Sequence, residues 1–324
     1  MSRINSKPEK ALPKGKEEKI KRMTVEENDP LTLMEFIKSR TGEERRSALK
    51  DWLSRGQVAV DGIVTTNVAA PLHAGQRVDL NYTRAFVRFR HPRLRILYED
   101  ADIIVVEKGY GLLSVATDPS KKEETAYSIL RDYVKSQSPA NKVFIIHRLD
   151  QATSGVMMFA RSAEAKEAMQ HNWKNMVLDR RYAAVVEGAP EKEEGVVKSY
   201  LGETSAHEMY SSTNPKDGKE AVTRFRVLHK GKFYSLMEYS LDTGRKNQIR
   251  IHSKVMGCPI AGDKRYGGHT SPLHRLALHA RTLNFVHPVT RRLMQFESPV
   301  PGGFYRLAGT SREALAKNEN PDRK

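Results

Sequence analysis

The sequence predicts an α+β protein built from a small N-terminal domain and a larger domain behind it. Its 324 residues, of which 39% are hydrophobic, suffice for one large core together with a small one. Between residues 30 and 82, two stretches with helical spacing precede a tight hairpin. After residue 95, short apolar runs typical of strands alternate with helical segments. These observations favour two cores made of mixed strands and helices.

The small domain is expected over residues 30–82. Apolar side chains recur at helical spacing over 33–37 and again over 49–53, which predicts two helices. Residues 57–64 surround an Asp-Gly pair, the pattern of two short strands joined by a tight turn. Residues 73–80 predict a further turn and a closing strand. Two helices followed by a hairpin therefore define this domain.

Polar segments border the two domains. Residues 1–25 are rich in lysine, and we expect a disordered basic arm because so few apolar side chains cannot offset the entropy of ordering. Residues 83–95 interleave arginines with phenylalanines and predict a linker able to contact phosphates and stack on bases. The larger domain is expected over 96–310, and a polar tail over 311–324.

The charge of the chain points to a polyanionic partner. Lysine and arginine number 55 against 39 acidic residues, a formal net charge of +16, and basic groups that neutralise phosphates release condensed counterions. A basic surface kept for solubility is the alternative. Cys258 is the single cysteine, so an intrachain disulfide is excluded and a reducing compartment is expected. No apolar stretch approaches a membrane span, and we expect a cytoplasmic protein.

The segment with the most chemical content lies between two apolar runs that predict buried strands. Its nine residues, 147–155, are largely polar and are expected to form a loop held within the core. Asp150 lies in the middle of this loop, where both sides hold it rigidly. On spacing alone, a single aspartate in a loop is more often a cap or turn residue.

The same nine residues, His-Arg-Leu-Asp-x-x-Thr-Ser-Gly, resemble the signature loop of the RluA-type RNA pseudouridine synthases. Further motifs follow in the family's order, and the resemblance covers about residues 95–305: a strand and Gly-Leu turn over 103–114, Arg-Tyr-Ala-Ala-Val-Val-Glu-Gly over 181–188, Leu-Asp-Thr-Gly-Arg-Lys-Asn-Gln-Ile-Arg-Ile-His over 241–252, and three segments over 257–280. The resemblance implies a mixed, mostly antiparallel sheet with flanking helices and a central cleft. It also implies isomerisation of uridine in RNA without a cofactor or a metal.

The resemblance assigns catalytic roles to three residues. Asp150 is implied as nucleophile or base, and a carboxylate in a dry cleft needs a cation to stay ionised. Arg250 is implied as that cation, with Arg245 as the second choice and otherwise a phosphate ligand. Tyr182 is implied to stack on the target uracil, and Leu278 to pack on the other side of the pocket. The sequence leaves open whether Asp150 attacks the ribose, attacks the base or abstracts a ribose proton.

Extrusion of the uridine from folded RNA adds further expected RNA contacts. Arg148 resembles the family residue that fills the vacated stack, His147 is expected to help hold the flipped nucleotide, and Thr153 completes this set. Two departures from the family pattern stand out: Gly109 replaces a proline, which makes that loop less rigid, and Asn247 replaces a histidine. The second departure argues against proton transfer at position 247.

Residues 31–80 resemble the S4 RNA-binding domain, whose pattern includes a basic second helix and a Gly-x-Val-x-Val-Asn/Asp-Gly hairpin. Four basic residues of this chain lie on or beside the predicted second helix, where that family contacts phosphates: Arg45, Arg46, Lys50 and Arg55. A solvated helix face is the alternative interpretation.

RNA is the partner that these observations predict, and a monomer is expected. Large-subunit (23S) ribosomal RNA is the first choice of substrate and transfer RNA the second. Two other classes stay open: an inert RNA-binding or ribosome-assembly factor on the same fold, and a glycosidic hydrolase, which would need a second carboxylate near Asp150. The histidines at 252, 274, 279 and 287 lack zinc-ligand spacing.

Overall fold

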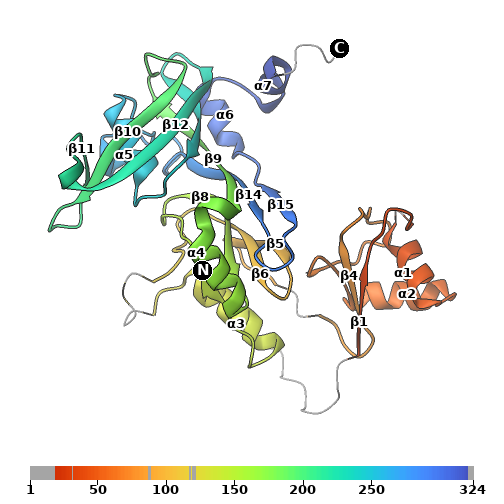
Figure 1. Ribbon diagram of the computed structural model, residues 1–324. Coiled ribbons are helices and arrows are strands. Elements are labelled where there is room, and N and C mark those ends of the chain that lie inside the picture. Colours follow the sequence, from red (N-terminus) through yellow and green to blue (C-terminus); the bar gives the residue numbers. More distant parts are fainter. Residues whose placement is uncertain (1–18, 31, 87–88, 117, 119–121, 320–324) are drawn as a thin grey trace, which may run out of the picture. The chain divides into compact units, whose positions relative to one another are not determined.

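The computed structural model of the protein describes residues 19–30, 32–86, 89–116, 118 and 122–319 (Figure 1). The chain divides into two compact units, residues 1–88 and residues 89–324. Within the described ranges, none of the helices combines the length and the apolar character that a membrane-spanning segment needs.

The N-terminal unit combines two helices with a four-stranded antiparallel sheet of order β1-β4-β2-β3. Its helices and β4 share one core, in which Phe36, Leu53 and Leu80 are fully buried. Its elements are β1 (Ile20–Thr24), α1 (Leu33–Thr41), α2 (Arg46–Ser54), β2 (Val58–Val60), β3 (Ile63–Val64) and β4 (Arg77–Asn81).

Turn chemistry in this unit agrees with the sequence prediction. Asp61 and Gly62, between β2 and β3, both have positive φ, 48° and 76°, as the tightest hairpin turns require. Gly56 has a φ of 71° directly after α2 ends, a conformation that costs glycine little. The two predicted helices and the predicted hairpin are therefore present.

The predicted disorder of residues 1–25 is wrong for the last part of that segment. β1 pairs with β4 over five residues, from Ile20 opposite Asn81 to Thr24 opposite Arg77, and it buries Met23. Local composition cannot reveal this strand, because its hydrogen-bond partners lie more than fifty residues further along the chain. Residues 1–18 lie outside the described residues.

The C-terminal unit is built on an eleven-stranded mixed sheet. Its main path runs β11-β10-β12-β13-β9-β14-β8-β6-β5, with β15 added beside β14 and β7 beside β8. Among the described residues, β8 and β14 form the one parallel pair, so the predicted mixed, mostly antiparallel sheet is confirmed. The strands are β5 (Leu94–Glu99), β6 (Ile103–Lys108), β7 (Phe144–Ile145), β8 (Ser154–Ala160), β9 (Val177–Glu187), β10 (Glu194–Glu203), β11 (Met209–Ser212), β12 (Lys219–Lys230), β13 (Tyr234–Leu241), β14 (Leu278–Val286) and β15 (Leu293–Glu297).

Helices cover this sheet on both faces. Alternate residues of β6 and β8 pack in two separate cores, one containing α3 and the other α4. Because both faces are covered, β8 is buried along its whole length, which explains its uninterrupted apolar sequence. The helices are α3 (Ala126–Gln137), α4 (Ala163–Met176), α5 (Gln248–Val255), α6 (Gly302–Ala308) and α7 (Arg312–Glu319), with short 3₁₀ turns η1 (Pro215–Asp217) and η2 (Lys264–Tyr266).

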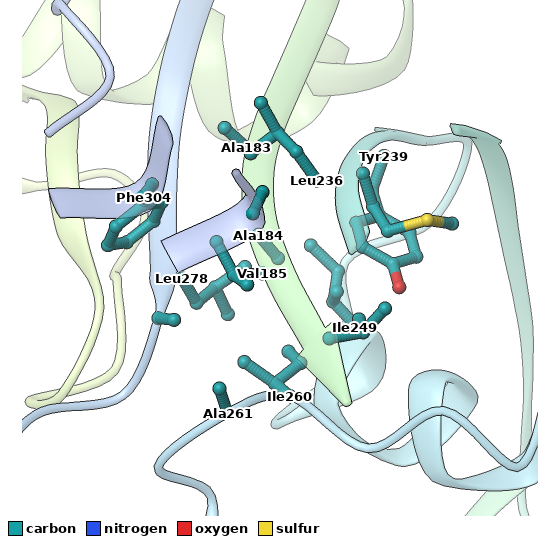
Figure 2. Close-up of a cluster of buried hydrophobic side chains, with 14 of the residues drawn as sticks. Ala183, Ala184, Val185, Leu236, Tyr239, Ile249, Ile260, Ala261, Leu278 and Phe304 are labelled. Carbon is teal, nitrogen blue, oxygen red and sulfur yellow. The ribbon is translucent and has the colours of Figure 1, made fainter. Parts of the chain in front are cut away.

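A third core joins the middle of the sheet to α5 and α6 (Figure 2). Val185 of β9 lies at its centre, between Ile249 of α5 on one side and Phe304 of α6 on the other. Leu278, at the start of β14, belongs to the same cluster and is 3% exposed. This core therefore fixes the start of α5 and of β14 relative to β9, and all three carry predicted site residues.

Gly155 is the residue that allows β8 and β14 to meet. It lies opposite Ala280 in the parallel pair and has a φ of 120°. A side chain here would place its Cβ 2.0 Å from the carbonyl oxygen of Ala280, so only glycine fits. The loop that precedes β8 can consequently approach β14 closely.

Two domain boundaries differ from those predicted. β5 begins at Leu94, inside the predicted linker 83–95, because its pairing with β6 supplies hydrogen bonds that the arginine-rich sequence does not reveal. α7 lies inside the predicted polar tail, and its Leu315 packs against the third core. Residues 320–324 lie outside the described residues.

Candidate active site

The loop between β7 and β8 carries Asp150 and is tied down on both sides of it. The Ser114 hydroxyl donates to the Leu149 carbonyl oxygen at 2.6 Å and accepts the Leu149 N–H at 3.1 Å. The Lys108 ammonium donates to the Gln151 carbonyl oxygen at 3.2 Å. The flanking backbone of Asp150 is thus fixed to β6 and to the segment after it.

Lys108 is not among the residues predicted from the sequence. Its side chain is fully buried, and its ammonium also donates to the carbonyl oxygens of Gly109, at 3.1 Å, and Leu112, at 2.8 Å. Burial lowers the pKa of Lys108 to about 7, while the nearby Asp150 carboxylate raises it. The sequence did contain a signal for Lys108, because it ends the apolar strand β6. A charged side chain is buried at such a position only when it is paired or hydrogen-bonded.

Asp150 opens into a pocket of about 840 Å³, towards the upper end of the range for sites that enclose drug-sized ligands. Its walls come from the Asp150 loop, the end of α4, β9, the loop before α5, and the start of β14. Predicted site residues in these walls are His147, Arg148, Asp150, Thr153, Tyr182, Arg245, Arg250 and Leu278. All eight predicted residues of the larger domain therefore meet at one cavity.

The Asp150 carboxylate accepts no hydrogen bond from any described residue. Burial raises its pKa above the ordinary aspartate value, and three cations oppose this effect, Arg250 most strongly, then Arg148 and Lys108. The carboxylate therefore has free acceptor positions, and the three cations surround it with a positive electrostatic potential. Such a group is more basic and more reactive than a solvated aspartate.

Arg250 does not form the direct ion pair with Asp150 that the sequence predicts. Its guanidinium makes two bonds of 2.7 Å to the Asp263 carboxylate, which is completely buried, and a bond of 2.9 Å to Oδ1 of Asn247. It also lies over the Tyr266 ring, 4.8 Å from the ring centre. Arg250 is thus held rigidly by other residues and acts on Asp150 through its charge.

Asn247 stabilises this arrangement. It precedes α5 with a φ of 57°, and its side chain donates to the Tyr266 hydroxyl at 2.9 Å while accepting from Arg250. Asn247 occupies the N-cap position of α5, but its side chain does not cap the helix. Asparagine tolerates this left-handed conformation better than most residues, which accounts for its use here.

Tyr182 and Leu278 form the apolar side of the pocket. Tyr182 is half-buried in the middle of β9, where it packs against two of the hydrophobic cores. Burial raises the pKa of its phenol, so the ring stays neutral. Leu278 is buried and lies on the neighbouring strand, β14, paired with Ala184. An aromatic face and an aliphatic side chain thus border the space beside Asp150.

His147 is engaged with the protein itself. Its Nε2 accepts the Met158 N–H at 3.0 Å, and its ring lies 4.9 Å from the Trp173 ring. Burial lowers the pKa of His147 to about 3, with the charge of Arg180 adding to the effect. The imidazole is therefore neutral, and this bond fixes the loop to β8 and leaves the ring proton on Nδ1.

Arg148, by contrast, is exposed at the pocket and has no side-chain partner among the described residues. Thr153 is buried, and its N–H donates to the Asp150 carbonyl oxygen at 3.0 Å, so its role is to close the loop turn. Arg245 is exposed, and its Nε donates to the Glu220 carbonyl oxygen at 3.0 Å. Arg148 and Arg245 thus keep donors available for a ligand.

Two further pocket residues, Arg180 and Trp173, are absent from the sequence prediction. Arg180 lies two positions before Tyr182 on β9, and alternate residues of a strand share a face. That spacing was the available signal for Arg180. The sequence contained no comparable signal for Trp173. Its position depends on a bend of α4 at Asn172, where the backbone is non-helical (φ −115°, ψ 22°).

The four predicted RNA-binding residues of the N-terminal unit, Arg45, Arg46, Lys50 and Arg55, are all exposed. Arg45 makes an ion pair of 3.1 Å with Glu43, and Arg55 lies 3.7 Å from Asp51. Arg46 and Lys50 of α2 have no ion-pair partner among the described residues. Exposed pairs of this kind contribute little, so all four side chains can exchange their contacts for phosphates.

Among the described residues, one group of side chains could hold a cation: Asp100, Asp102 and His287, whose ligand atoms lie within 4.8 Å of one another. Its atoms already have partners. Nδ1 of His287 accepts the N–H groups of Val289 and Thr290, so Nε2 carries the proton and donates to Asp100 at 2.9 Å. The group is therefore a structural network between β5, β6 and the end of β14.

Comparison with known proteins identifies the family. The model described as RNA pseudouridylate synthase matches residues 102–254. The uncharacterized RNA pseudouridine synthase YlyB of Bacillus subtilis (strain 168) is 34% identical over 299 residues, 90% of this chain and 97% of that protein. Ribosomal large subunit pseudouridine synthase D of Vibrio cholerae is 30% identical over 295 residues, 86% of this chain and 90% of that protein.

Solved structures agree in fold. The human RNA pseudouridylate synthase domain containing 4 has a TM-score of 0.53 and 24% identity, covering 64% of this chain and 89% of that one. The α+β fold with a mixed sheet is thus the pseudouridine synthase fold. The chain belongs to the RNA pseudouridine synthase family, a class of isomerases that modify RNA.

Proposed function

We propose that this enzyme converts specific uridines of structured RNA to pseudouridine, that its substrate is large-subunit ribosomal RNA, and that Asp150 is the nucleophile or base. The free carboxylate of Asp150, rigidly held in a positive pocket, is the observation that carries the proposal. In the reaction the C1′–N1 bond breaks and a C1′–C5 bond forms. The C5 hydrogen passes to solvent and N1 gains a proton, so the composition of the nucleotide is unchanged and no redox partner is needed.

The electrostatics around Asp150 suit this role. Burial makes the carboxylate a stronger base, and the charge of Arg250 keeps it from being protonated permanently. The bonds from Arg250 to Asp263 and Asn247 hold the guanidinium in place, so little reorganisation is needed when charge develops on the substrate.

The apolar walls suit a base that must be detached, turned and re-attached. The ring of Tyr182 offers a stacking surface, and stacking depends little on the orientation of the base. Leu278 would confine the uracil from the other side. A detached uracil would stay in the pocket long enough to present C5 in place of N1.

Arg148 is proposed to enter the helical stack when the uridine leaves it. Its side chain is exposed at the pocket rim two residues from Asp150, as such a role requires. Replacement of Arg148 by alanine should reduce turnover on structured RNA more than on a short single strand containing the same uridine. Equal losses on both substrates would exclude this role.

The N-terminal unit is proposed to act as an S4-like RNA-binding domain. Its two helices, the Asp61–Gly62 hairpin turn and the exposed basic residues on and beside α2 support this assignment. Arg46 and Lys50 are the first candidates for phosphate binding. A substitution that removes one side chain bound to a phosphate should reduce the slope of log affinity against log salt by about 0.7 to 0.9.

Ribosomal RNA is proposed as the substrate because relatives that align with most of the chain, such as the Vibrio cholerae protein, are named ribosomal large subunit pseudouridine synthases. The test is release of tritium from ribosomal and transfer RNA labelled at uracil C5, with the wild type compared with Asp150→Ala. Release by the wild type alone from ribosomal RNA is expected. Release from transfer RNA only would change the substrate, and binding without release from any RNA would indicate an inert RNA-binding factor.

A further inference from the structure

The pocket extends well beyond the surroundings of Asp150. Six consecutive residues at the end of α4, 170–175, line it together with Arg180 of β9. None of them takes part in the proposed handling of the uridine. A cavity of about 840 Å³ is larger than a single uracil needs, because pockets of about 300 Å³ already enclose small drug-like ligands.

Arg180 supplies a cation at this far end. Its guanidinium donates to the Leu241 carbonyl oxygen at 3.1 Å and forms no ion pair with any carboxylate of the described residues. Gly244 gives it room, since a Cβ at that position would lie only 3.0 Å from its Nη1. An arginine lining a cavity without a counterion, with most of its five N–H donors free, is suited to bind an anion such as a phosphodiester.

Trp173 supplies an apolar surface beside this cation. Its half-buried ring lies 4.9 Å from the His147 ring and 5.6 Å from the Arg180 guanidinium, and its indole N–H donates to no described residue. The bend at Asn172 places the tryptophan in the pocket wall. An aromatic ring next to an unneutralised arginine is the combination that single-stranded nucleic acids favour.

We propose that Arg180 and Trp173 form a second subsite, which binds the phosphate and base of a nucleotide adjoining the target uridine. The inference rests on the proposed function, since it takes the other end of the pocket as the uridine site. Arg180 and Tyr182 share one face of β9, so the two subsites adjoin along a single strand. The enzyme would therefore recognise a short extruded or single-stranded segment of RNA rather than one isolated uridine.

The chain offers a local probe for this subsite. It contains two tryptophans, Trp52 in the N-terminal unit and Trp173. A Trp52→Phe variant leaves Trp173 as the single tryptophan, so quenching of its fluorescence reports occupancy of the subsite. The probes are uridine, the dinucleotide UpU, the trinucleotide UpUpU, and UpUpU with neutral methylphosphonate linkages.

We expect UpUpU to quench Trp173 in a salt-dependent manner and uridine to have little effect. Neutral linkages should weaken binding about tenfold or more, and Arg180→Gln should do the same to natural UpUpU, as expected for a charge-assisted hydrogen bond. The Arg180→Gln variant should no longer distinguish neutral from charged linkages. Arg131→Gln, which alters an exposed arginine of α3 outside the pocket, should behave as the parent does.

Equal affinity of the parent for neutral and charged UpUpU would overturn the proposal, and this comparison needs no mutant that might misfold. Tritium release that depends on Asp150, without any quenching by oligouridylates, would leave the isomerase function standing and remove the subsite. Phosphate-dependent quenching without tritium release from any RNA would support the subsite and remove the proposed isomerase function.

Discussion

Two loops of the C-terminal unit each carry an aspartate that follows a strand, and the two carboxylates differ in their hydrogen bonds. Asp100, after β5, accepts hydrogen bonds from the Tyr98 hydroxyl, the amides of Asp102 and Ile103, and the His287 imidazole, all at 2.8 to 2.9 Å. Asp150, after β7, accepts none from the described residues. Burial would raise the pKa of both groups, but the hydrogen bonds of Asp100 lower its pKa to about 2.

The difference shows how one fold produces a carboxylate saturated with hydrogen bonds and one left open to a pocket. In the Asp150 loop the hydrogen bonds fix the backbone, through Ser114 and Lys108, and leave the carboxylate open to the pocket. In the Asp100 loop they saturate the carboxylate itself. A carboxylate without hydrogen bonds keeps its basicity for a substrate, at some cost in stability.

The largest expected effect is on catalysis. Asp150→Asn should reduce the rate of tritium release by about 10²-fold to 10⁴-fold or more, because it removes the proposed nucleophile or base. It should leave the free energy of unfolding unchanged or slightly higher, because the Asp150 carboxylate has no hydrogen bond to a described residue. Denaturant unfolding alongside the activity assay checks both. If the Asp150→Asn variant lost stability but kept activity, Asp150 would be a structural carboxylate like Asp100, and the proposed difference between the two would be wrong.

The opposite outcome is expected for Asp100→Asn. The depressed pKa of Asp100 contributes about 2 kcal/mol to stability, fully present above the unfolded value near 4 and lost as the pH falls towards 2. The variant should therefore unfold more easily by about 2 kcal/mol at pH 7. Its tritium-release rate should match the wild type under conditions where both are folded. A tenfold loss of activity without a loss of stability would contradict a purely structural role.

The next effect concerns the pH dependence of activity. The proposed role of Asp150 requires its ionised form, and its raised pKa should place the acid limb of kcat/KM above the range of an ordinary aspartate. Arg250→Gln removes the strongest opposing cation and should move this limb to higher pH. Asp263→Asn removes a negative charge that raises the pKa of Asp150 and should move the limb to lower pH. Shifts of the same sign in both variants would contradict this electrostatic account.

The smallest effect is expected at Asn247. Asn247→Ala removes the hydrogen bonds with Arg250 and Tyr266 and should cost about 1 kcal/mol of stability, with a modest decrease in kcat. Asn247→Gly is the matched control, because it removes the same hydrogen bonds while tolerating the positive φ. Similar losses in the two variants would assign the effect to the side-chain hydrogen bonds, and a loss in alanine alone would assign it to the backbone.

Much of the site could be predicted from the sequence, since the motifs around Asp150, Tyr182 and Arg250 each specify a local structure. The remaining features of the fold and the site depend on contacts between residues that are far apart in the sequence. Nothing near Arg250 in the chain indicates that Asp263 would bind its guanidinium, and nothing near Ile20–Thr24 indicates a strand paired with β4. Trp173 reaches the pocket through a bend in α4 that its helical sequence does not predict.

The sequence by itself determined the elements with local causes: the polar loop of Asp150 between apolar strands, the Asp61–Gly62 turn, the two helices before it, and the net charge that favours RNA. These follow from residue type and spacing alone. Only the tertiary structure decided that the Asp150 carboxylate is left open to the pocket and that His287 completes the hydrogen bonds of Asp100. Three donors to Asp100 are near neighbours in the chain, whereas His287 and the Ser114 hydroxyl that holds the backbone beside Asp150 are distant, and only folding brings these two into contact.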